Sequence, residues 1–69
     1  MKIDTVSLAI IQRMRGISGR DLAKAAGIHP GSLSNIKRTE KARPITARAL
    51  ARALGVDLSE IIKKEGEKE

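Results

Sequence analysis

The chain has 69 residues, a formal net charge of +6, no cysteine, and none of Phe, Trp and Tyr. This length is enough for one small domain, and without cysteine neither a disulfide bond nor a cysteine-based zinc site can stabilise it. The missing aromatic side chains also exclude the base stacking used by single-strand binders and by the common RNA-binding sheets. Every apolar periodicity in the chain is helical, so the sequence predicts an all-α fold with helices packed on helices.

The first predicted helix spans residues 5–15, with Asp4 as its N-cap and Gly16 at its end. Its apolar side chains cover about 200° of the helical wheel at about 100° per residue, more than one core-facing side needs. We expect the additional flank either to cover the last helix of the fold or to contact a second subunit or another protein. This flank consists of Ile3, Val6, Ile10 and Met14.

The second predicted helix spans residues 19–26. Ser18 is at the N-cap position, and Asp21 three residues later completes a pattern similar to a capping box. Gly27 follows the last turn, where a residue in the left-handed conformation ends a helix and redirects the chain. The sequence therefore predicts a sharp turn after this helix.

A third helix is predicted over residues 30–38, with His29 as N-cap and Pro30 at the first position, where no amide hydrogen is needed. Apolar residues in both helices and in the turn form a wedge that fixes the angle between the helices. The wedge comprises Leu22, Ile28, Leu33 and Ile36, while the small side chain of Ala23, which lies on the same side of the second helix as Leu22 and Ala26, lets the two helix backbones approach closely. Two short helices held in this way are typical of a helix-turn-helix, which presents its second helix to the major groove of DNA.

A loop over residues 39–45 is expected to lead to a fourth helix over residues 47–54, with Thr46 as N-cap and Gly55 at its end. Pro44 supports the loop, because proline disfavours a helical conformation in the residue before it. The fourth helix is rich in alanine, and its small side chains allow close packing of the other helices against it.

A fifth helix is expected to begin after Asp57, which pairs with Glu60 as a capping box, and to end after Lys64. We therefore expect one domain over residues 1–64 and a charged, frayed tail over residues 65–69. The expected core draws on all five helices and on the turns between them. It comprises Leu8, Ile11, Ile17, Leu22, Ala23, Ala26, Ile28, Leu33, Ile36, Leu50, Leu54, Val56, Leu58, Ile61 and Ile62.

Basic residues are concentrated at and after the end of the third helix. From Lys37 to Arg52 the chain has six Lys or Arg residues and a single acid, Glu40. A patch of this kind attracts polyanions. Duplex DNA, which is held by its phosphates and read at its base edges, is the polyanion that suits a chain without aromatic rings.

With these elements in place, the chain resembles the Cro/phage-repressor-type class of helix-turn-helix domains, also called XRE-like. The resemblance covers residues 8–62 and implies a compact five-helix, lambda-repressor-like domain that binds an operator as a two-fold dimer and controls transcription, most often by repression. It rests on Gly16-Ile17-Ser18, Leu22-Ala23, Gly27-Ile28, Leu33, Ile36 and the run from Ala51 to Leu58.

Family members often begin the third helix with long polar residues that reach base edges, but here those positions are Pro30 and Gly31. The residues expected to contact bases are therefore His29, Ser32, Asn35 and Arg38. Asn35 has the amide geometry for paired hydrogen bonds to adenine, and His29 has the N-cap as its alternative role. The residues expected to contact phosphates are Ser18, Lys37, Lys41 and Arg43. Arg48 and Arg52 are further candidates for phosphate contacts, and their alternative role is to solvate the exposed face of the fourth helix.

One His, no Cys and no metal-ligand spacing argue against an enzyme, and we expect no cofactor and no metal. Apolar runs are too short to cross a membrane, and the first residues lack the pattern of a signal peptide, so a cytoplasmic protein without a membrane partner is expected. The favoured function is a sequence-specific regulator, most often a repressor, that binds double-stranded DNA as a homodimer. The alternatives are a protein-interaction or antitoxin-type module that keeps the fold, and a nonspecific nucleoid-type binder.

Overall fold

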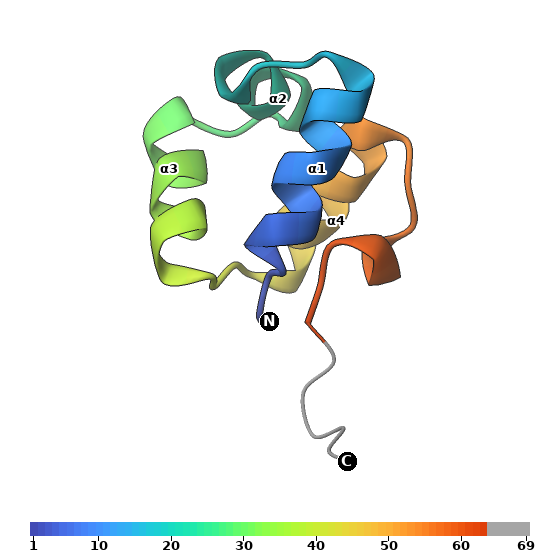
Figure 1. The fold of residues 1–69 in the computed structure, drawn as a ribbon. Coiled ribbons are helices and arrows are strands. Elements are labelled where there is room, and N and C mark those ends of the chain that lie inside the picture. Colours follow the sequence, from blue (N-terminus) through green and yellow to red (C-terminus); the bar gives the residue numbers. More distant parts are fainter. Residues whose placement is uncertain (64–69) are drawn as a thin grey trace.

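The computed structural model describes residues 1–63, and all regular elements within them are helical. In chain order these are α1 (Thr5–Arg15), α2 (Gly19–Ala26), α3 (Pro30–Thr39), α4 (Pro44–Leu54) and a 3-10 turn, η1 (Leu58–Glu60). In the view of Figure 1, α2 lies at the top, α3 at one side, and α4 behind α1. The all-α class is confirmed. The expected tail over residues 65–69 and the predicted helix end at Lys64 lie outside the described residues.

α1 and α2 span the predicted residues, and α3 runs one residue further than predicted, to Thr39. Gly16 and Gly27 end the first two helices in the left-handed conformation, with φ angles of 65° and 75°. Ser18 Oγ accepts a hydrogen bond from the Asp21 N–H at 3.1 Å, so it caps α2 as predicted. These boundaries depend on side chains within a few residues of each end, which is why the sequence predicts them well.

α4 begins at Pro44 rather than Ala47, so the predicted loop and the predicted N-cap at Thr46 are both wrong. Proline is favourable at the first position of a helix because its missing N–H would have no partner there and its φ already fits. Arg43 is the N-cap, and its side chain makes no capping hydrogen bond. The connection between α3 and α4 is therefore short and brings the start of α4 close to the end of α3.

The predicted fifth helix is also wrong within residues 1–63, because only the single turn η1 is helical there. Asp57 precedes this turn without a side-chain capping bond, so the predicted capping box does not form. The chain then runs beside the N-terminal segment: Asp4 N–H donates to Ile61 O at 2.8 Å, and Lys63 N–H donates to Lys2 O at 3.0 Å. Backbone pairing with a segment far away in the sequence replaces the helical bonds that local patterning suggests.

The N-terminal segment also pairs with the connection after α3. Ile3 N–H donates to Glu40 O at 2.9 Å, and Ala42 N–H donates to Met1 O at 3.0 Å. Ile3 is completely buried beside the segment after η1, so of its two expected roles, covering the last element or contacting a partner, the partner contact is wrong. Ile3 does not share the helical repeat of Val6, Ile10 and Met14, because α1 begins only at Thr5 and Ile3 precedes it.

Glu40 ends α3 with a φ of 62°, the only non-glycine residue in the described part of the chain with a positive φ. This conformation is unfavourable for a side chain with a Cβ atom. The energetic cost of this conformation is offset by two backbone hydrogen bonds. Glu40 N–H donates to Ile36 O at 2.7 Å, and Glu40 O accepts the bond from Ile3 N–H. Its carboxylate also accepts hydrogen bonds from Lys63 Nζ at 3.1 Å and from Thr5 Oγ1 at 3.4 Å. Glu40 thus ties the end of α3 to both terminal segments.

Every residue of the expected core is buried or packs against the buried cluster. Four further residues are buried that were not part of the expected core: Ile3, Gln12, Ala47 and Ala51. The two alanines lie on α4, which packs against α2 and α1, and their small side chains permit a close approach of the helices. This packing leaves α2 as the central support of α3.

Asp4 provides a test of the N-cap of α1 by pH. Its carboxylate accepts hydrogen bonds from the Ser7 N–H and from the Ser7 hydroxyl, each at 3.1 Å, and these bonds lower the pKa of Asp4 below its usual 3.8. Because the pKa is lower in the folded state, the charged carboxylate stabilises the fold above the ordinary value, and this contribution is lost as the pH falls through the folded pKa.

We therefore expect the melting temperature of Asp4→Asn, which keeps a capping side chain but cannot titrate, to fall less than that of the wild type on acidification. Circular dichroism melts from about pH 6 to about pH 3 measure the difference. Equal decreases in both proteins would contradict the role given to the charge.

Candidate nucleic-acid interface

α3 has a buried side and an exposed side. Leu33 and Ile36 are buried against the core, whereas Ser32 and Asn35 are exposed to solvent. The geometry follows from the helical repeat, because residues three apart lie close together around the helix and the two polar residues are rotated by about 100° from the two apolar ones. α3 is therefore held from behind by apolar contacts and presents a polar surface outward, as a major-groove helix requires.

His29 is the N-cap of α3, as predicted. Its Nδ1 accepts a hydrogen bond from the Gly31 N–H at 2.9 Å. A Cβ atom added to Gly31 would lie only 3.1 Å from Nδ1, so glycine at this position leaves room for the capping imidazole. Because Nδ1 is the acceptor, the proton of the neutral ring is on Nε2, which is free to point outward as a donor. A base contact by His29 remains a prediction.

Asn35 and Arg38 lie next to each other on the exposed side of α3. Arg38 Nη2 donates a hydrogen bond to Asn35 Oδ1. The spacing of three residues places the two side chains on neighbouring turns of one helix face. Two of the predicted base-contacting residues therefore form a pair, with the amide oxygen of one bound to the guanidinium of the other.

A shallow hollow lies between α3 and the start of α4, next to the exposed side chains of α3. Arg43 stands at its edge because α4 begins directly after it. Arg43, which the sequence predicts in a loop, lines this hollow together with Ser32 and Asn35, two of the expected base-contacting residues. The hollow is lined by Ile28, Ser32, Asn35, Ile36, Ala42, Arg43 and Thr46.

Two of the expected phosphate-contacting residues, Ser18 and Lys37, are brought together at the start of α2. A Cβ atom on Gly19 would lie 3.9 Å from Lys37 Nζ, so the ammonium group reaches the first turn of α2, which Ser18 caps. The N-terminus of a helix favours an anion because its free N–H groups and the helix dipole point toward it. This part of the surface therefore combines a lysine charge with exposed backbone donors.

Lys41 and Arg43 are exposed on the connection that follows α3. The nearby acid Glu40 forms a salt bridge with Lys63 at 3.1 Å, so its charge is compensated locally. Lys37 on one side of α3 and these two residues on the other leave the helix flanked by positive charge. Flanking cations are what a helix inserted between two phosphate backbones needs.

Arg48 and Arg52 are exposed on α4 and belong to a different part of the surface. They line two hollows on α4, one with Ile45 and Ala49, the other with residues that include Val56. The hollow beside α3 contains neither arginine. The structure therefore does not bring them together with the exposed side of α3.

Gln12 is a polar residue that sequence reasoning did not assign to the core. It is buried in α1, and its Nε2 donates to Ile17 O at 3.3 Å, which holds the turn that leads into α2. Its Oε1 is buried without a hydrogen-bond partner among the described residues. Its place on the side of α1 that carries Leu8 is a sequence signal of burial, since residues four apart share a helix face.

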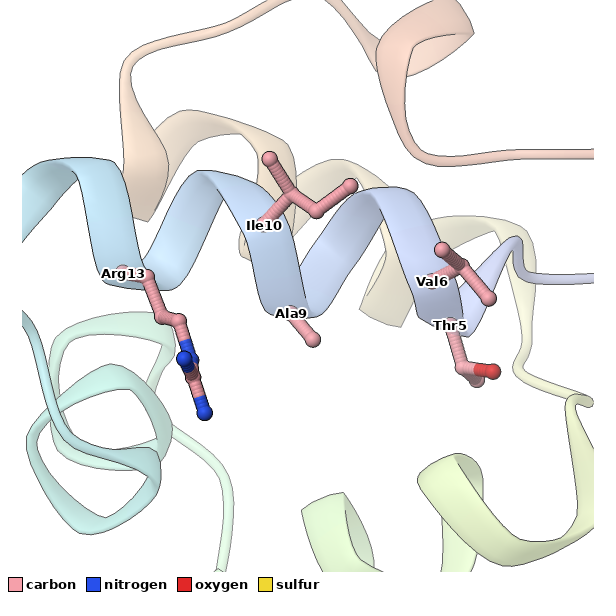
Figure 2. Close-up of a pocket in the computed structure, with 5 residues that line it drawn as sticks. All are labelled: Thr5, Val6, Ala9, Ile10 and Arg13. Atoms are coloured by element: carbon pink, nitrogen blue, oxygen red, sulfur yellow. The ribbon is translucent and has the colours of Figure 1, made fainter.

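The exposed side of α1 retains three of the four residues of the predicted flank: Val6, Ile10 and Met14. They are 68%, 53% and 79% exposed, so they do not cover a fifth helix. Figure 2 shows Val6 and Ile10 on a shallow hollow along α1, together with Thr5, Ala9 and Arg13. This surface is apolar in its middle and basic at one end.

Within residues 1–63, no group of three or more His, Asp or Glu side chains is placed to hold a metal ion. None of the helices in this part of the chain has the length and apolar character needed to cross a membrane.

Two short helices joined at a left-handed glycine, with the second exposed and flanked by lysine and arginine, define a helix-turn-helix domain of the DNA-binding type. A helix-turn-helix family model (HTH_3) matches residues 9–61. The chain therefore belongs to the helix-turn-helix family of Cro/C1 type, or XRE family, whose members are DNA-binding regulators of transcription. The resemblance stated from the sequence is confirmed.

Solved structures with a similar fold include "Native PhpD with Cadmium Atoms", PhpD with cadmium complexed with hydroethylphosphonate, and a point mutant of hydroxyethylphosphonate dioxygenase. Each is 28% identical to this chain, with TM-scores of 0.81, 0.81 and 0.83. The similarity covers 97% of this chain but only 15% of each of those chains. The comparison with curated proteins found no match.

Proposed function

We propose that this protein is a cytoplasmic, sequence-specific regulator of transcription, acting as a repressor, with residues 1–64 as its DNA-binding domain. The observation that carries the proposal is the exposed polar side of α3, fixed from behind by Leu33 and Ile36. A helix of ten residues is about 15 Å long, enough to lie across a major groove about 12 Å wide.

In the proposed complex, Ser32, Asn35 and Arg38 face the base edges. Phosphates of the two backbones lie against Ser18 and Lys37 at the start of α2, and against Lys41 and Arg43 beyond the end of α3. A homodimer places two such helices about 34 Å apart on a near-palindromic operator, one turn of B-DNA. Bound across a promoter, the dimer excludes the transcription machinery.

Selection of duplexes from a random pool, followed by binding titrations at several salt concentrations, tests the proposal. We expect a symmetric motif with two half-sites. Six lysine or arginine contacts in a dimer predict a slope of log affinity against log salt of about −5, or about a 1000-fold loss between roughly 50 and 200 mM salt. A flat salt response would contradict phosphate binding, and a selection without consensus would favour a nonspecific nucleoid-type binder.

A second function, a protein-interaction module, is supported by the apolar surface of α1. Its exposed residues Val6, Ile10 and Met14 are available to a partner. A stoichiometric partner lost on Ile10→Glu, together with weak and sequence-independent DNA binding, would favour this function.

A further inference from the structure

The exposed side of α3 offers mainly hydrogen-bond donors, because His29 Nδ1 and Asn35 Oδ1 each already accept a hydrogen bond. His29 Nδ1 accepts the Gly31 N–H at 2.9 Å, which leaves the Nε2–H of the neutral ring as the outward group. Asn35 Oδ1 accepts a hydrogen bond from Arg38 Nη2, which leaves the amide hydrogens of Asn35 outward. Arg38 has only donors. Ser32 has a hydroxyl that serves as donor or acceptor.

This arrangement bears directly on which base α3 reads. An asparagine recognises adenine by accepting a bond from N6 and donating one to N7, so the adenine amino group has to approach the amide oxygen. In this protein the amide oxygen is bound to the guanidinium of Arg38. That oxygen has a second lone pair, but an adenine N6 donor bound to it would stand beside the positively charged donors of Arg38. Asn35 alone therefore does not define the specificity of this face.

Guanine is the base that matches a face of donors. Its major-groove edge carries two adjacent acceptors, N7 and O6, whereas adenine and cytosine each present an amino donor and thymine presents one acceptor beside a methyl group. The amide hydrogens of Asn35 and the remaining N–H groups of Arg38 lie on the same helix face, three residues apart, so both are available to such an edge.

We propose that Asn35 and Arg38 act as one unit that selects guanine, and that the half-site is guanine-rich where α3 contacts it. The proposal rests on the DNA-binding function proposed above and deepens it. His29 adds a further donor nearer the start of α3. Arg38 has two roles in this unit: it binds guanine itself, and its charged donors beside Asn35 Oδ1 disfavour the N6 donor of adenine there.

The test compares the full chain with Arg38→Met on duplexes that carry the selected motif. For the wild type, replacing the contacted guanine with adenine should weaken binding by about 5- to 150-fold, the usual range for a lost paired base contact. Replacement with 7-deazaguanine, which lacks the N7 acceptor, should also weaken it. Arg38→Met removes the charged donors beside Asn35 Oδ1 and should shift the preference at this base pair from guanine to adenine.

Arg48→Met is the matched control, because it makes the same chemical change on α4, away from the exposed side of α3. It should keep the preference for guanine. A wild-type motif with adenine at the contacted pair, or an Arg38→Met variant that still prefers guanine, would overturn the proposal. Equal binding to all duplexes would overturn the proposed sequence-specific function as well, so the two failures are distinguishable.

Discussion

Replacing Leu22 with alanine is expected to unfold the domain. Leu22 is completely buried on α2, the helix that packs against both α3 and α4. Removing most of a buried leucine side chain lowers the free energy of unfolding by about 2–5 kcal/mol. A single core in a domain this small supplies only about 3–5 kcal/mol, so the variant has little or no stability left.

Thermal and urea unfolding followed by circular dichroism measure this effect. Leu22→Met is the matched control, since it nearly conserves the side-chain volume and should cost less than about 1.5 kcal/mol. If Leu22→Ala melted at the wild-type temperature, Leu22 would not belong to the packing that holds α3 against the rest of the fold.

Removing the three cations that flank α3 is expected to cause the largest loss of DNA binding. The variant combines Lys37→Gln, Lys41→Gln and Arg43→Gln, all at exposed positions, so the fold should remain intact. Each phosphate contact contributes about 0.9 to the salt slope, so three contacts contribute about 2.7 per bound protomer. Over a fourfold rise in salt, this term alone weakens wild-type binding by about 40-fold per protomer.

The matched control combines Arg15→Gln, Arg48→Gln and Arg52→Gln, which removes the same charge from other parts of the surface. Arg15 lies beside Gly55 at the end of α4, and the other two line hollows on α4. Fluorescence anisotropy at several salt concentrations should give the control a slope close to that of the wild type. If both variants lost the same slope, the net charge of the protein rather than the surface around α3 would govern binding.

The first three helices were predictable because residues directly next to their ends determine where these helices begin and end. Ser18 and His29 bond to N–H groups two or three residues away, and Gly27 needs only its own φ to end α2. Such signals do not depend on the rest of the fold, so a sequence pattern is sufficient to read them.

The C-terminal part and the N-terminal segment were not predictable in this way. Residues 58–62 have the apolar spacing of a helix, but backbone bonds to Lys2 and Asp4 hold the chain after η1 extended. The same pairing buries Ile3, which a helical wheel places on one flank of the first helix with Val6, Ile10 and Met14. Local periodicity cannot indicate a backbone hydrogen-bond partner that lies more than fifty residues away in the sequence.

For the interface, the sequence predicted which residues are exposed but not what their atoms bind. Exposure of Ser32 and Asn35 follows from the helical repeat. The bond between Arg38 and Asn35 depends on rotamers, and the position of Arg43 depends on where α4 begins. These two features change the expected chemistry of the site, and neither is encoded in spacing alone.

The bond from Lys63 N–H to Lys2 O means that the chain enters and leaves this unit side by side. Neighbouring ends are the condition for inserting a folded unit into a loop of a host protein, or for joining the ends and opening the chain elsewhere. A helix-turn-helix domain with this geometry can therefore be inserted within a longer polypeptide while its two ends remain close together.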